Sequence, residues 1–550
     1  MDGARERLFF IPPDATAPPA DVNVVGSKAF GLLRVAQRGL RVPPAFVLGT
    51  DLCRAYFEGG ERLPEEVRGM LETGLARLAE RTGQRFGDTR RPLLVAVRSG
   101  AAVSMPGMLD TLLNIGLSEH NLHGLLRSTG NPRLTRDCYR RLVRDFTSIV
   151  HGVSAAPFDA LVERRCREQG LGSAGELDSA SLAELCAQSL ETALAVSGQP
   201  FPQAPMEQLE QAVAAVLRSW NSDKARHYRR LNGIDELLGT AVTVQAMVFG
   251  NGGSTSGAGV GFTRDPASGE NALYVDFLFN SQGEDVVSGR HPVENSARLE
   301  RTLPEVAREL ERLKGLLEDE FHDMQDFEFT VADGRLYLLQ TRAGKRTPWA
   351  ALRIAVDLVR EGRLTQAQAL DLLRSYELER IERARLDAQA GAEPLAVAVP
   401  ASIGVAAGAV VFDCARAVER AARGESVILA RPDIATADVE GIAAAAGILT
   451  ASGGRTSHAA VVARQLGKVC LVGCSQLRIE DNGRGCHFGG QRLEEGEPIT
   501  LDGDSGRVYR GRLHIVREQP ERELAEIRSW RTPGAPLEPT RASSGRARPN

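Results

Sequence analysis

The spacing of apolar and polar residues along the chain alternates between a helical and a strand-like period. Through residues 116–232, apolar side chains recur at three- and four-residue spacing with few β-branched runs, which predicts an almost entirely helical region. Between 239 and 342, short apolar runs are separated by turn residues, which predicts strands. The Asp333-Gly334 dipeptide between two of these runs predicts a hairpin turn.

Over the whole chain, the pattern predicts a multidomain protein of mixed α/β and α+β class. We expect five parts in order: a flexible N-terminal segment (1–22), a mixed unit (23–347) with the helices of 116–232 inserted in it, a charged helical linker (348–395), a compact α/β unit (396–513) and a disordered tail (514–550). The last expectation rests on composition, because the end of the chain is rich in Arg, Pro, Gly and Ser.

Composition narrows the possible function classes. The 550 residues are enough for several domains, and the net charge of −4 shows no basic excess of the kind that binds nucleic acid. No apolar run approaches the roughly 18–20 residues of a membrane span, and the first residues mix charges without a secretory apolar core. We therefore expect a cytoplasmic protein with neither nucleic-acid nor membrane partners.

The eight cysteines are scattered over the chain, unlike a disulfide framework. Cys470, Cys474 and Cys486 with His487 raise the alternative of a zinc site. Their spacing differs from the usual C-x2-C pair of zinc ligands, so we expect buried thiols instead.

A segment rich in glycine and hydroxyl residues, from Phe249 to Gly261, is the first candidate phosphate site. It lies between two strand-like runs and includes Gly257. Glycines let backbone N–H groups approach phosphate oxygens, and hydroxyls add further donors. The alternative is a flexible hairpin tip. The chain has no G-x-x-x-x-G-K-[ST] motif, so a P-loop is excluded.

Charged residues on the strands around the predicted hairpin are the second candidate. If the strands alternate regularly, Glu328 and Gln340 come close on one face, an oxygen-ligand pair that suits Mg²⁺. Arg342 would then neutralise phosphate charge. Arg98, after an apolar run, and Lys28, at a helix start, are further candidate phosphate contacts. For each of these residues the alternative is a solvated surface charge.

The sharpest segment surrounds His458. A strand-like run leads into a Gly453-Gly454 turn, and Thr456 or Ser457 then caps a helix that holds His458 in its first turn. The free N–H groups and positive dipole end of such a helix suit a phosphoryl group on the imidazole. Neutral imidazole is nucleophilic near pH 7, which makes it a good phosphoryl carrier. The alternative is a structural histidine at a helix start.

Several runs of residues, in this order, resemble the pyruvate, phosphate dikinase family from about Val24 to Gly511. The matching runs are Leu94 to Gly100, Ser104 to Thr111, Ser219 to Ser222, Gln245 to Asn251, Gln282 to Val287, Asp323 to Phe329, Leu339 to Arg342 and Gly453 to Arg464. The resemblance implies an ATP-grasp nucleotide domain over 23–347 with a helical insertion. It further implies a swivelling α/β phosphohistidine domain over 396–513.

The resemblance also implies the roles of individual residues. ATP and Mg²⁺ would be bound by Lys28, Arg98, Gln245, Gly257, Asp326, Glu328, Gln340 and Arg342. Among these, Arg98 and Arg342 would act catalytically with His458, and Glu328 and Gln340 would bind the metal. Thr456 stands where relatives have a threonine that is phosphorylated to switch the enzyme off.

In the family, the β-phosphoryl group of ATP ends on the histidine, the γ-phosphoryl group goes to phosphate, and AMP and pyrophosphate leave. The family continues into a barrel of about 250 residues that binds pyruvate and phosphoenolpyruvate (PEP). The segment after Leu513 is too short for such a barrel, so we expect a separate PEP/pyruvate-binding partner. A homodimer and water as second acceptor stay open.

Two positions depart from the family pattern. Gly26-Ser27-Lys28-Ala29 stands where the family has Gly-Gly-Lys-Gly, and Ser254 stands where the family usually has glutamate. The alternatives to a dikinase are a kinase for an unrelated small molecule and an ATP-binding regulatory protein without turnover.

Overall fold

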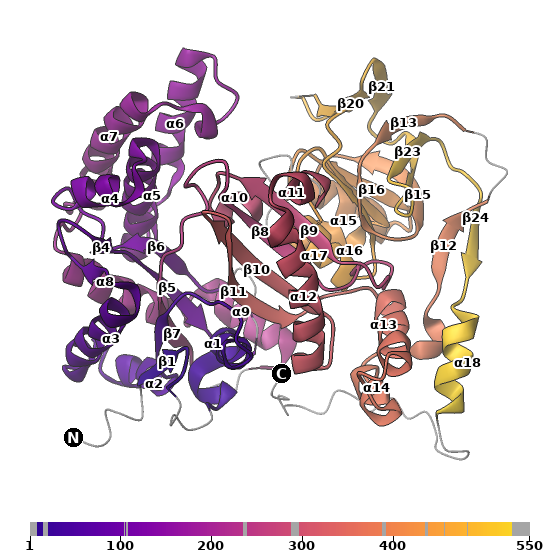
Figure 1. Ribbon diagram of the computed structural model, residues 1–550. Coiled ribbons are helices and arrows are strands. Elements are labelled where there is room, and N and C mark those ends of the chain that lie inside the picture. The colour runs from indigo at the N-terminus through magenta and orange to yellow at the C-terminus, as the bar shows by residue number, and fades with distance from the viewer. Residues whose placement is uncertain are drawn as a thin grey trace. The chain divides into compact units, whose positions relative to one another are not determined.

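The computed structural model describes residues 8–14, 20–103, 105, 108–234, 239–287, 296–387, 392–434, 438–455, 457–480 and 482–530. The chain forms two compact units (Figure 1). The first holds the residues up to Gly252 together with Tyr337–Arg342, and the second holds Gly253–Leu336 and the described residues from Ala343 onward. The prediction of a mixed α/β multidomain protein is confirmed.

The first unit is built on a five-stranded antiparallel sheet with the strand order β1-β2-β7-β5-β6. Its strands are β1 (Leu8–Ile11), β2 (Ala45–Leu48), β5 (Val95–Gly100), β6 (Thr111–Ile115) and β7 (Ala241–Ala246). A short parallel pair, β3 (Arg85–Phe86) and β4 (Pro92–Leu93), lies outside it. Since β1 pairs with β2, the prediction of a flexible segment over 1–22 is wrong for these four residues, because pairing to a distant strand leaves no local signal.

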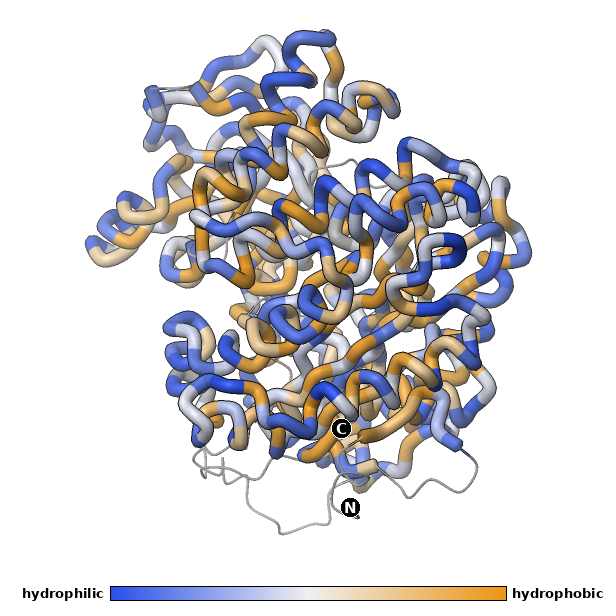
Figure 2. Tube along the Cα trace, turned by 90° about the vertical axis from the view of Figure 1, so that its left-hand side faces the viewer, coloured by the Kyte–Doolittle hydropathy of each residue, from blue (hydrophilic) through white to orange (hydrophobic). Residues whose placement is uncertain are grey.

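Nine described helices accompany this sheet in the chain from Val22 to Asn232. They are α1 (Val22–Gln37), α2 (Asp51–Glu58), α3 (Glu66–Thr82), α4 (Leu122–Thr129), α5 (Pro132–His151), α6 (Ala156–Gln169), α7 (Ser179–Ser197), α8 (Pro205–Ser219) and α9 (Asp223–Asn232), with a 3₁₀ turn at Ala174–Glu176. The helical prediction for 116–232 is confirmed by α4 to α9. Hydrophobic and hydrophilic positions alternate along these helices (Figure 2), as amphipathic helices require.

Local signals define where these helices begin and end. In α5 the Asn131 side chain accepts a hydrogen bond from the Leu134 amide (2.9 Å), and Pro132 occupies the first turn, where its missing N–H is not needed. Gly152 ends the helix in the left-handed conformation with φ 69°.

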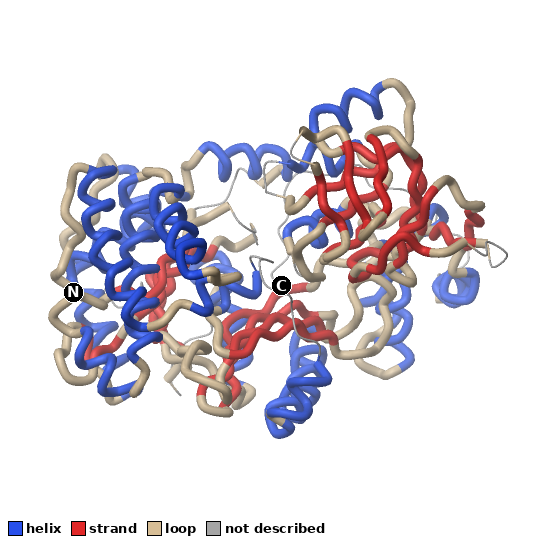
Figure 3. The backbone as a smooth tube through the Cα atoms, turned by 90° about the horizontal axis from the view of Figure 1, so that it is seen from above, coloured by secondary structure: helices blue, strands red, loops and turns tan. Residues whose placement is uncertain are grey.

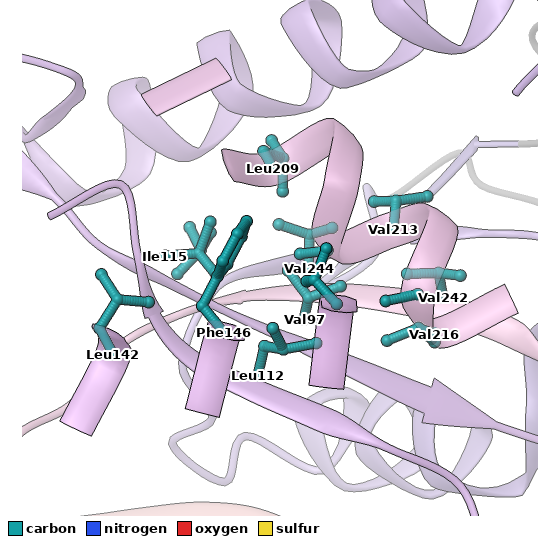
Figure 4. Packing of buried hydrophobic residues seen from close by; sticks show 14 of the residues in the cluster. Val97, Leu112, Ile115, Leu142, Phe146, Leu209, Val213, Val216, Val242 and Val244 are labelled. Carbon is teal, nitrogen blue, oxygen red and sulfur yellow. The ribbon is translucent and has the colours of Figure 1, made fainter. Parts of the chain in front are cut away.

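The core of the first unit lies between one face of the sheet and helices α5 and α8 (Figure 4). Its converging side chains are Val97, Leu112, Ile115, Leu142, Phe146, Leu209, Val213, Val216, Val242 and Val244, all buried. Because strand side chains alternate in direction, the residues between these valines point to the opposite face. That opposite face of β5 and β7 carries Arg98, Thr243 and Gln245, and helix α1 packs against both strands.

A second sheet has four strands in the order β11-β10-β8-β9, and its strand β11 contains the residues Tyr337–Arg342 that group with the first unit. Its strands are β8 (Gly257–Phe262), β9 (Tyr274–Phe279), β10 (Gln325–Ala332) and β11 (Arg335–Ala343), accompanied by α10 (Gly283–Val287), α11 (Ser296–Thr302) and α12 (Pro304–Phe321). The predicted hairpin is confirmed, because Asp333 and Gly334 both have positive φ (48° and 72°) in the turn between β10 and β11.

The connection that follows differs from the predicted helical linker. It contains α13 (Pro348–Arg360), α14 (Gln366–Leu372), a 3₁₀ turn at Leu378–Arg380 and then a strand, β12 (Arg383–Leu386). This strand pairs with β24 (Ile515–Glu518), and α18 (Glu521–Ser529) buries Leu524 and Ile527 in a cluster with α13. The prediction of a helix at 383–386 is therefore wrong. The prediction of a disordered tail from 514 is wrong as far as Ser529. Distant pairing and packing, which composition does not reveal, order both segments, and residues 531–550 lie outside the described chain.

The remaining α/β part is an eight-stranded sheet ordered β13-β23-β22-β15-β16-β17-β18-β14 (red strands in Figure 3). Its strands are β13 (Pro394–Val397), β14 (Val399–Ser402), β15 (Val405–Val411), β16 (Val427–Arg431), β17 (Gly447–Thr450), β18 (Val469–Val472), β22 (Pro498–Asp502) and β23 (Arg507–Arg510). A small sheet of β19 (Leu477–Ile479), β20 (Gly485–Phe488) and β21 (Gln491–Glu494) lies beside it in sequence.

Strands β15 to β18 run parallel, and helices α15 (Cys414–Ala422), α16 (Val439–Ala444) and α17 (His458–Gln465) connect them. Loops at the carboxyl ends of parallel strands commonly hold ligands. The loop from β17 to α17 is such a loop. Among the described helices, none has both the length and the apolar character that a membrane span requires.

Candidate functional site

The start of helix α1 is attached to the end of strand β5. Gly26 interrupts the helix with φ 77°, and a methyl group there would lie 2.1 Å from the Gly100 carbonyl oxygen, so only glycine fits. The backbone amide and the hydroxyl of Ser27 both donate to the Ala101 carbonyl at 2.9 Å. Lys28 therefore follows a segment held beside the strand that carries Arg98.

Arg98 is the centre of a cluster in the first unit. Its Nη1 donates to the Gln245 side chain (3.3 Å) and to the Leu339 carbonyl (2.9 Å), and its Nη2 donates to the Gln340 side chain (3.3 Å). Gln245 and Gln340 are almost completely buried, whereas Arg98 is half-buried. The structure thus brings three of the predicted site residues together around one planar guanidinium group.

Two other predicted cations belong to the same unit. Arg342 follows Gln340 by two residues on β11, so the two side chains lie on one face of the strand. Lys28 and Arg342 are both half-buried. Lys28, Arg98 and Arg342, the cations predicted to bind phosphate, therefore all lie in the first unit.

Thr243, on the same face of the sheet as Arg98, is a residue that the sequence analysis missed. It is the cross-strand neighbour of Arg98, it is 3% exposed, and its hydroxyl has no hydrogen-bond partner among the described residues. Cross-strand neighbours in an antiparallel pair share a face of the sheet. The signal was present, because Thr243 and Gln245 are polar residues two positions apart in an otherwise apolar strand.

The carboxylates of the predicted site belong to the second unit. Asp326 and Glu328 are two residues apart on β10 and so share a face, where they oppose Phe262 and Val260 of β8. Asp326 is buried and Glu328 is half-buried. Carboxylate oxygens fit Mg²⁺, and the pairing of Glu328 with Gln340, on a neighbouring strand of the sheet, stays a prediction.

The glycines of the predicted phosphate loop have a packing function in β8. A methyl group on Gly257, Gly259 or Gly261 would lie 2.2–2.5 Å from the ring of Phe277, Phe329 or Phe327, respectively. Each glycine therefore leaves room for one aromatic ring, which explains their alternate spacing without a ligand. A phosphate contact at Gly257 stays a prediction.

The loop before His458 has the predicted helix start. Ser457 is the N-cap of α17 and accepts a hydrogen bond from the Ala460 amide (3.4 Å), while its own amide donates to the Gly454 carbonyl (3.0 Å). His458 is the first residue of the helix, where backbone N–H groups lack helical partners. The predicted regulatory residue Thr456 lies outside the described residues.

Helix α17 also contacts the sheet that carries Asp326. Arg464, in its last turn, is fully buried, and its guanidinium carbon lies 5.3 Å from the ring centre of Phe262. Phe262 is the cross-strand neighbour of Asp326. The helix headed by His458 and the strand of the predicted metal ligands are thus linked through two residues.

The three cysteines that raised the alternative of a zinc site are buried thiols, as the sequence predicts. All eight cysteines are free, and Cys470, Cys474 and Cys486 are buried. Burial raises the pKa of Cys470 and of Cys486 to about 12, so both stay protonated thiols near neutral pH. In the described part of the chain, no group of three or more His, Cys, Asp or Glu residues is arranged to hold a metal ion.

Comparison with known families gives the class of protein first. Residues 60–308 match the family model described as pyruvate phosphate dikinase, AMP/ATP-binding domain. Residues 423–506 match the model described as PEP-utilising enzyme, mobile domain. The chain thus joins a nucleotide-binding domain to a mobile domain.

Individual relatives narrow the class. The chain is 41% identical over 512 residues to pyruvate, phosphate dikinase of Clostridium symbiosum, covering 92% of this chain and 58% of that protein. It is 40% identical over 522 residues to the Rhizobium meliloti enzyme of the same name, covering 93% and 58%. For chloroplastic pyruvate, phosphate dikinase 1 of Arabidopsis thaliana, the identity is 41% over 510 residues, covering 92% and 53%.

These matches to pyruvate, phosphate dikinases, which cover more than nine-tenths of this chain, confirm the resemblance seen in its motifs. The chain spans little more than half the length of these curated relatives.

Proposed function

We propose that this chain is the ATP-dependent, histidine-phosphorylating part of a pyruvate, phosphate dikinase. In this proposal residues 23–347 form an ATP-grasp nucleotide domain, and residues 396–513 form a swivelling phosphohistidine domain. His458 is phosphorylated from ATP and then passes the phosphoryl group to pyruvate. The identity to relatives of that name across both domains supports the assignment.

One observation carries the proposal. Helix α17, which begins at His458, packs through Arg464 on Phe262, the cross-strand neighbour of Asp326. A phosphoryl carrier has to approach the nucleotide that it attacks, and this packing joins the carrier helix to the strand of the predicted metal ligands. A structural histidine would need no such neighbour.

The proposed chemistry proceeds in two transfers. The neutral imidazole of His458 attacks the β-phosphorus of ATP, an N–P bond forms, the bond between the β-phosphorus and the α–β bridging oxygen breaks, and AMP leaves. The γ-phosphoryl group then passes from the enzyme-bound diphosphate to inorganic phosphate, which releases pyrophosphate and leaves one phosphoryl group on His458. Arg98 and Arg342 would bind the phosphate oxygens, on which negative charge develops.

The residues present fit a Mg²⁺ ion. Glu328 and Gln340, with Asp326 nearby on β10, offer the hard oxygen ligands that Mg²⁺ prefers beside phosphate oxygens. When bound, the ion neutralises phosphate charge and orients the reacting groups. Lys28 and Arg98 complete the phosphate contacts, and Gln245 and Gly257 complete the proposed nucleotide site.

The final acceptor in the proposal is pyruvate. This step follows the name of the relatives. The chain covers 58% of the length of the Clostridium symbiosum enzyme. Phosphorylated His458 would transfer its phosphoryl group to the enolate oxygen of pyruvate, which gives PEP and free imidazole. Thr456 is proposed as the regulatory position, two residues before the carrier.

Labelling with ATP that carries the isotope at its β-phosphorus tests the proposal. With Mg²⁺ and phosphate, we expect acid-labile, alkali-stable label on the wild type and none on His458→Ala. His514→Ala is the matched control, because this imidazole is 74% exposed and pairs only with Asp387 among the contacts described. Label of equal amount on wild type and His458→Ala would remove His458 from the mechanism, and no label on either would reject autophosphorylation.

Pyruvate and the barrel domain of a relative, added to the labelled protein, test the acceptor. We expect the label to leave the chain and to appear in PEP. Label that stays on the chain under these conditions would reject pyruvate as the acceptor, while leaving the phosphorylation of His458 intact.

A further inference from the structure

Arg455, three residues before His458, makes a contact that links two distant parts of the second unit. Its Nη1 lies 3.1 Å from the Asp265 carboxylate, and its guanidinium carbon lies 4.6 Å from the ring centre of Tyr274. Asp265 and Tyr274 fall within the part of the chain that matches the AMP/ATP-binding domain, and Arg455 falls within the part that matches the mobile domain. The contact therefore joins the two domains.

Asp265 is prepared for this contact by its own loop. Its Oδ1 accepts hydrogen bonds from the amides of Ala267 (2.7 Å) and Ser268 (2.9 Å), which fixes the carboxylate in a turn. Its Oδ2 is then the oxygen that Arg455 approaches. A carboxylate held by its own turn loses little freedom when the arginine arrives.

The ring of Tyr274, which the Arg455 guanidinium group contacts, is also held in place by a hydrogen bond. The Tyr274 hydroxyl donates to Asp276, two residues along β9, so the ring has a fixed orientation. Burial and the neighbouring carboxylate raise the pKa of Tyr274, so the ring stays neutral beneath the guanidinium group. Arg455 thus meets a charge partner on one side and a ring face on another.

The contact constrains the position of His458. Three residues of chain span at most about 11 Å, so anchoring Arg455 restricts the start of α17 to a small volume. Asp265, the partner of Arg455, comes three residues after Phe262 in the chain, and Phe262 is the cross-strand neighbour of Asp326. The anchor therefore keeps the carrier loop near the start of β10.

The contact is also suited to release. The Arg455 and Asp265 side chains are 23% and 21% exposed, so water and salt reach the ion pair. Such pairs are weak and are screened by ions, unlike an apolar interface. A domain that must leave and return needs a contact of this strength.

We propose that Arg455, Asp265 and Tyr274 form a releasable clamp that positions the carrier loop against the AMP/ATP-binding domain while His458 is phosphorylated. The clamp rests on the proposed function, since it acts in that phosphorylation. Arg455 is a positioning residue in this proposal and takes no part in the bond changes. Its loss should slow the phosphorylation of His458 and leave the binding of ATP unchanged.

A double-mutant cycle tests the clamp. Asp265→Asn removes the charge but keeps the oxygen that caps the turn, and Arg455→Ala removes the guanidinium group. We expect each variant to lower the rate of label transfer from β-labelled ATP about tenfold, and the double variant to be no slower than Arg455→Ala. Arg423→Ala is the control, because this arginine pairs with Glu419 inside the α/β part that contains His458, and its rate should equal the wild type.

Five further measurements separate a clamp from a structural role. The ATP dissociation constant and the thermal midpoint should match the wild type, the rate should respond to salt less in Arg455→Ala than in the wild type, and Arg455→Lys should keep part of the rate. Hydrogen exchange of residues 265–276 should increase in Arg455→Ala even without nucleotide. Wild-type rates in Arg455→Ala, or additive losses in the double variant, would overturn the clamp. A wild type that takes up no label would instead reject the proposed function, and unchanged exchange in Arg455→Ala would then reject the clamp as well.

Discussion

Replacement of Thr243 by valine should stabilise the protein, although it removes a polar group from the face of the sheet that carries Arg98. The hydroxyl is buried and has no hydrogen-bond partner among the described residues. Valine has nearly the same shape, so the substitution exchanges a desolvated hydroxyl for a methyl group at little change in packing. A buried hydroxyl without a partner costs about 1–3 kcal/mol, and we expect Thr243→Val to recover about 1 kcal/mol of it.

Thermal unfolding and hydrogen exchange measure this gain. A change of 1 kcal/mol shifts the midpoint of a unit of this size by roughly 2–4 °C, and the amides of β7 should exchange more slowly. Thr240→Val is the matched control, since the Thr240 hydroxyl is also buried but accepts from the Gly100 amide and donates to the Ala241 carbonyl, both at 3.0 Å. The control should lose about 1–3 kcal/mol. Destabilisation of Thr243→Val to the same extent would refute the reasoning, because it would show that the hydroxyl has a partner.

Three further substitutions test other parts of the fold. Glu318→Gln should lose about 3–5 kcal/mol in thermal unfolding, because it weakens a fully buried ion pair with Arg264 (2.9 Å); a loss below 1 kcal/mol would contradict this. Gly259→Ala should lower the midpoint by several degrees, because its methyl group would lie 2.3 Å from the Phe329 ring, and an unchanged midpoint would contradict the packing role of the glycine. Burial raises the pKa of Asp137, but two arginines of the same helix outweigh it and lower the pKa to about 2, below the 3.8 of the unfolded chain. Its contribution is therefore present above pH 4 and is lost as the pH falls toward 2, and acid unfolding of Asp137→Asn should lack this part of the pH dependence.

The sequence predicted several residues of the Arg98 cluster, but not how the fold brings them together. Arg98, Gln245 and Gln340 were identified from motifs, and the structure places all three in one hydrogen-bonded cluster. Their grouping depends on pairs more than 90 residues apart, which no local period reveals. Thr243 was missed for the complementary reason, since its signal is local but belongs to no motif.

The glycine-rich strand shows how one composition fits two explanations. Consecutive glycines favour a loop whose backbone approaches a phosphate, whereas Gly257, Gly259 and Gly261 alternate with other residues. Alternation means that all three face one side of a strand, and that side is where the phenylalanine rings lie. The spacing, rather than the number of glycines, was therefore the informative part of the segment.

Arg455, in the loop before His458, and Arg464, in helix α17, differ in burial and in the partners of their side chains. Arg464 is fully buried, and its Nη1 donates to the carbonyls of Ala401 (3.0 Å) and Arg455 (2.7 Å), so its hydrogen bonds stay within the α/β part that contains His458. Burial lowers the pKa of Arg464, and the nearby acidic groups of Cys470, Asp326 and Asp265 oppose this shift. Arg455 instead directs its side chain to Asp265 of the other domain. In the proposed function the phosphoryl carrier visits two sites, so its loop has to be rigid in itself and reversible in its docking. The buried hydrogen bonds of Arg464 would meet the first need, and the solvent-accessible ion pair of Arg455 would meet the second.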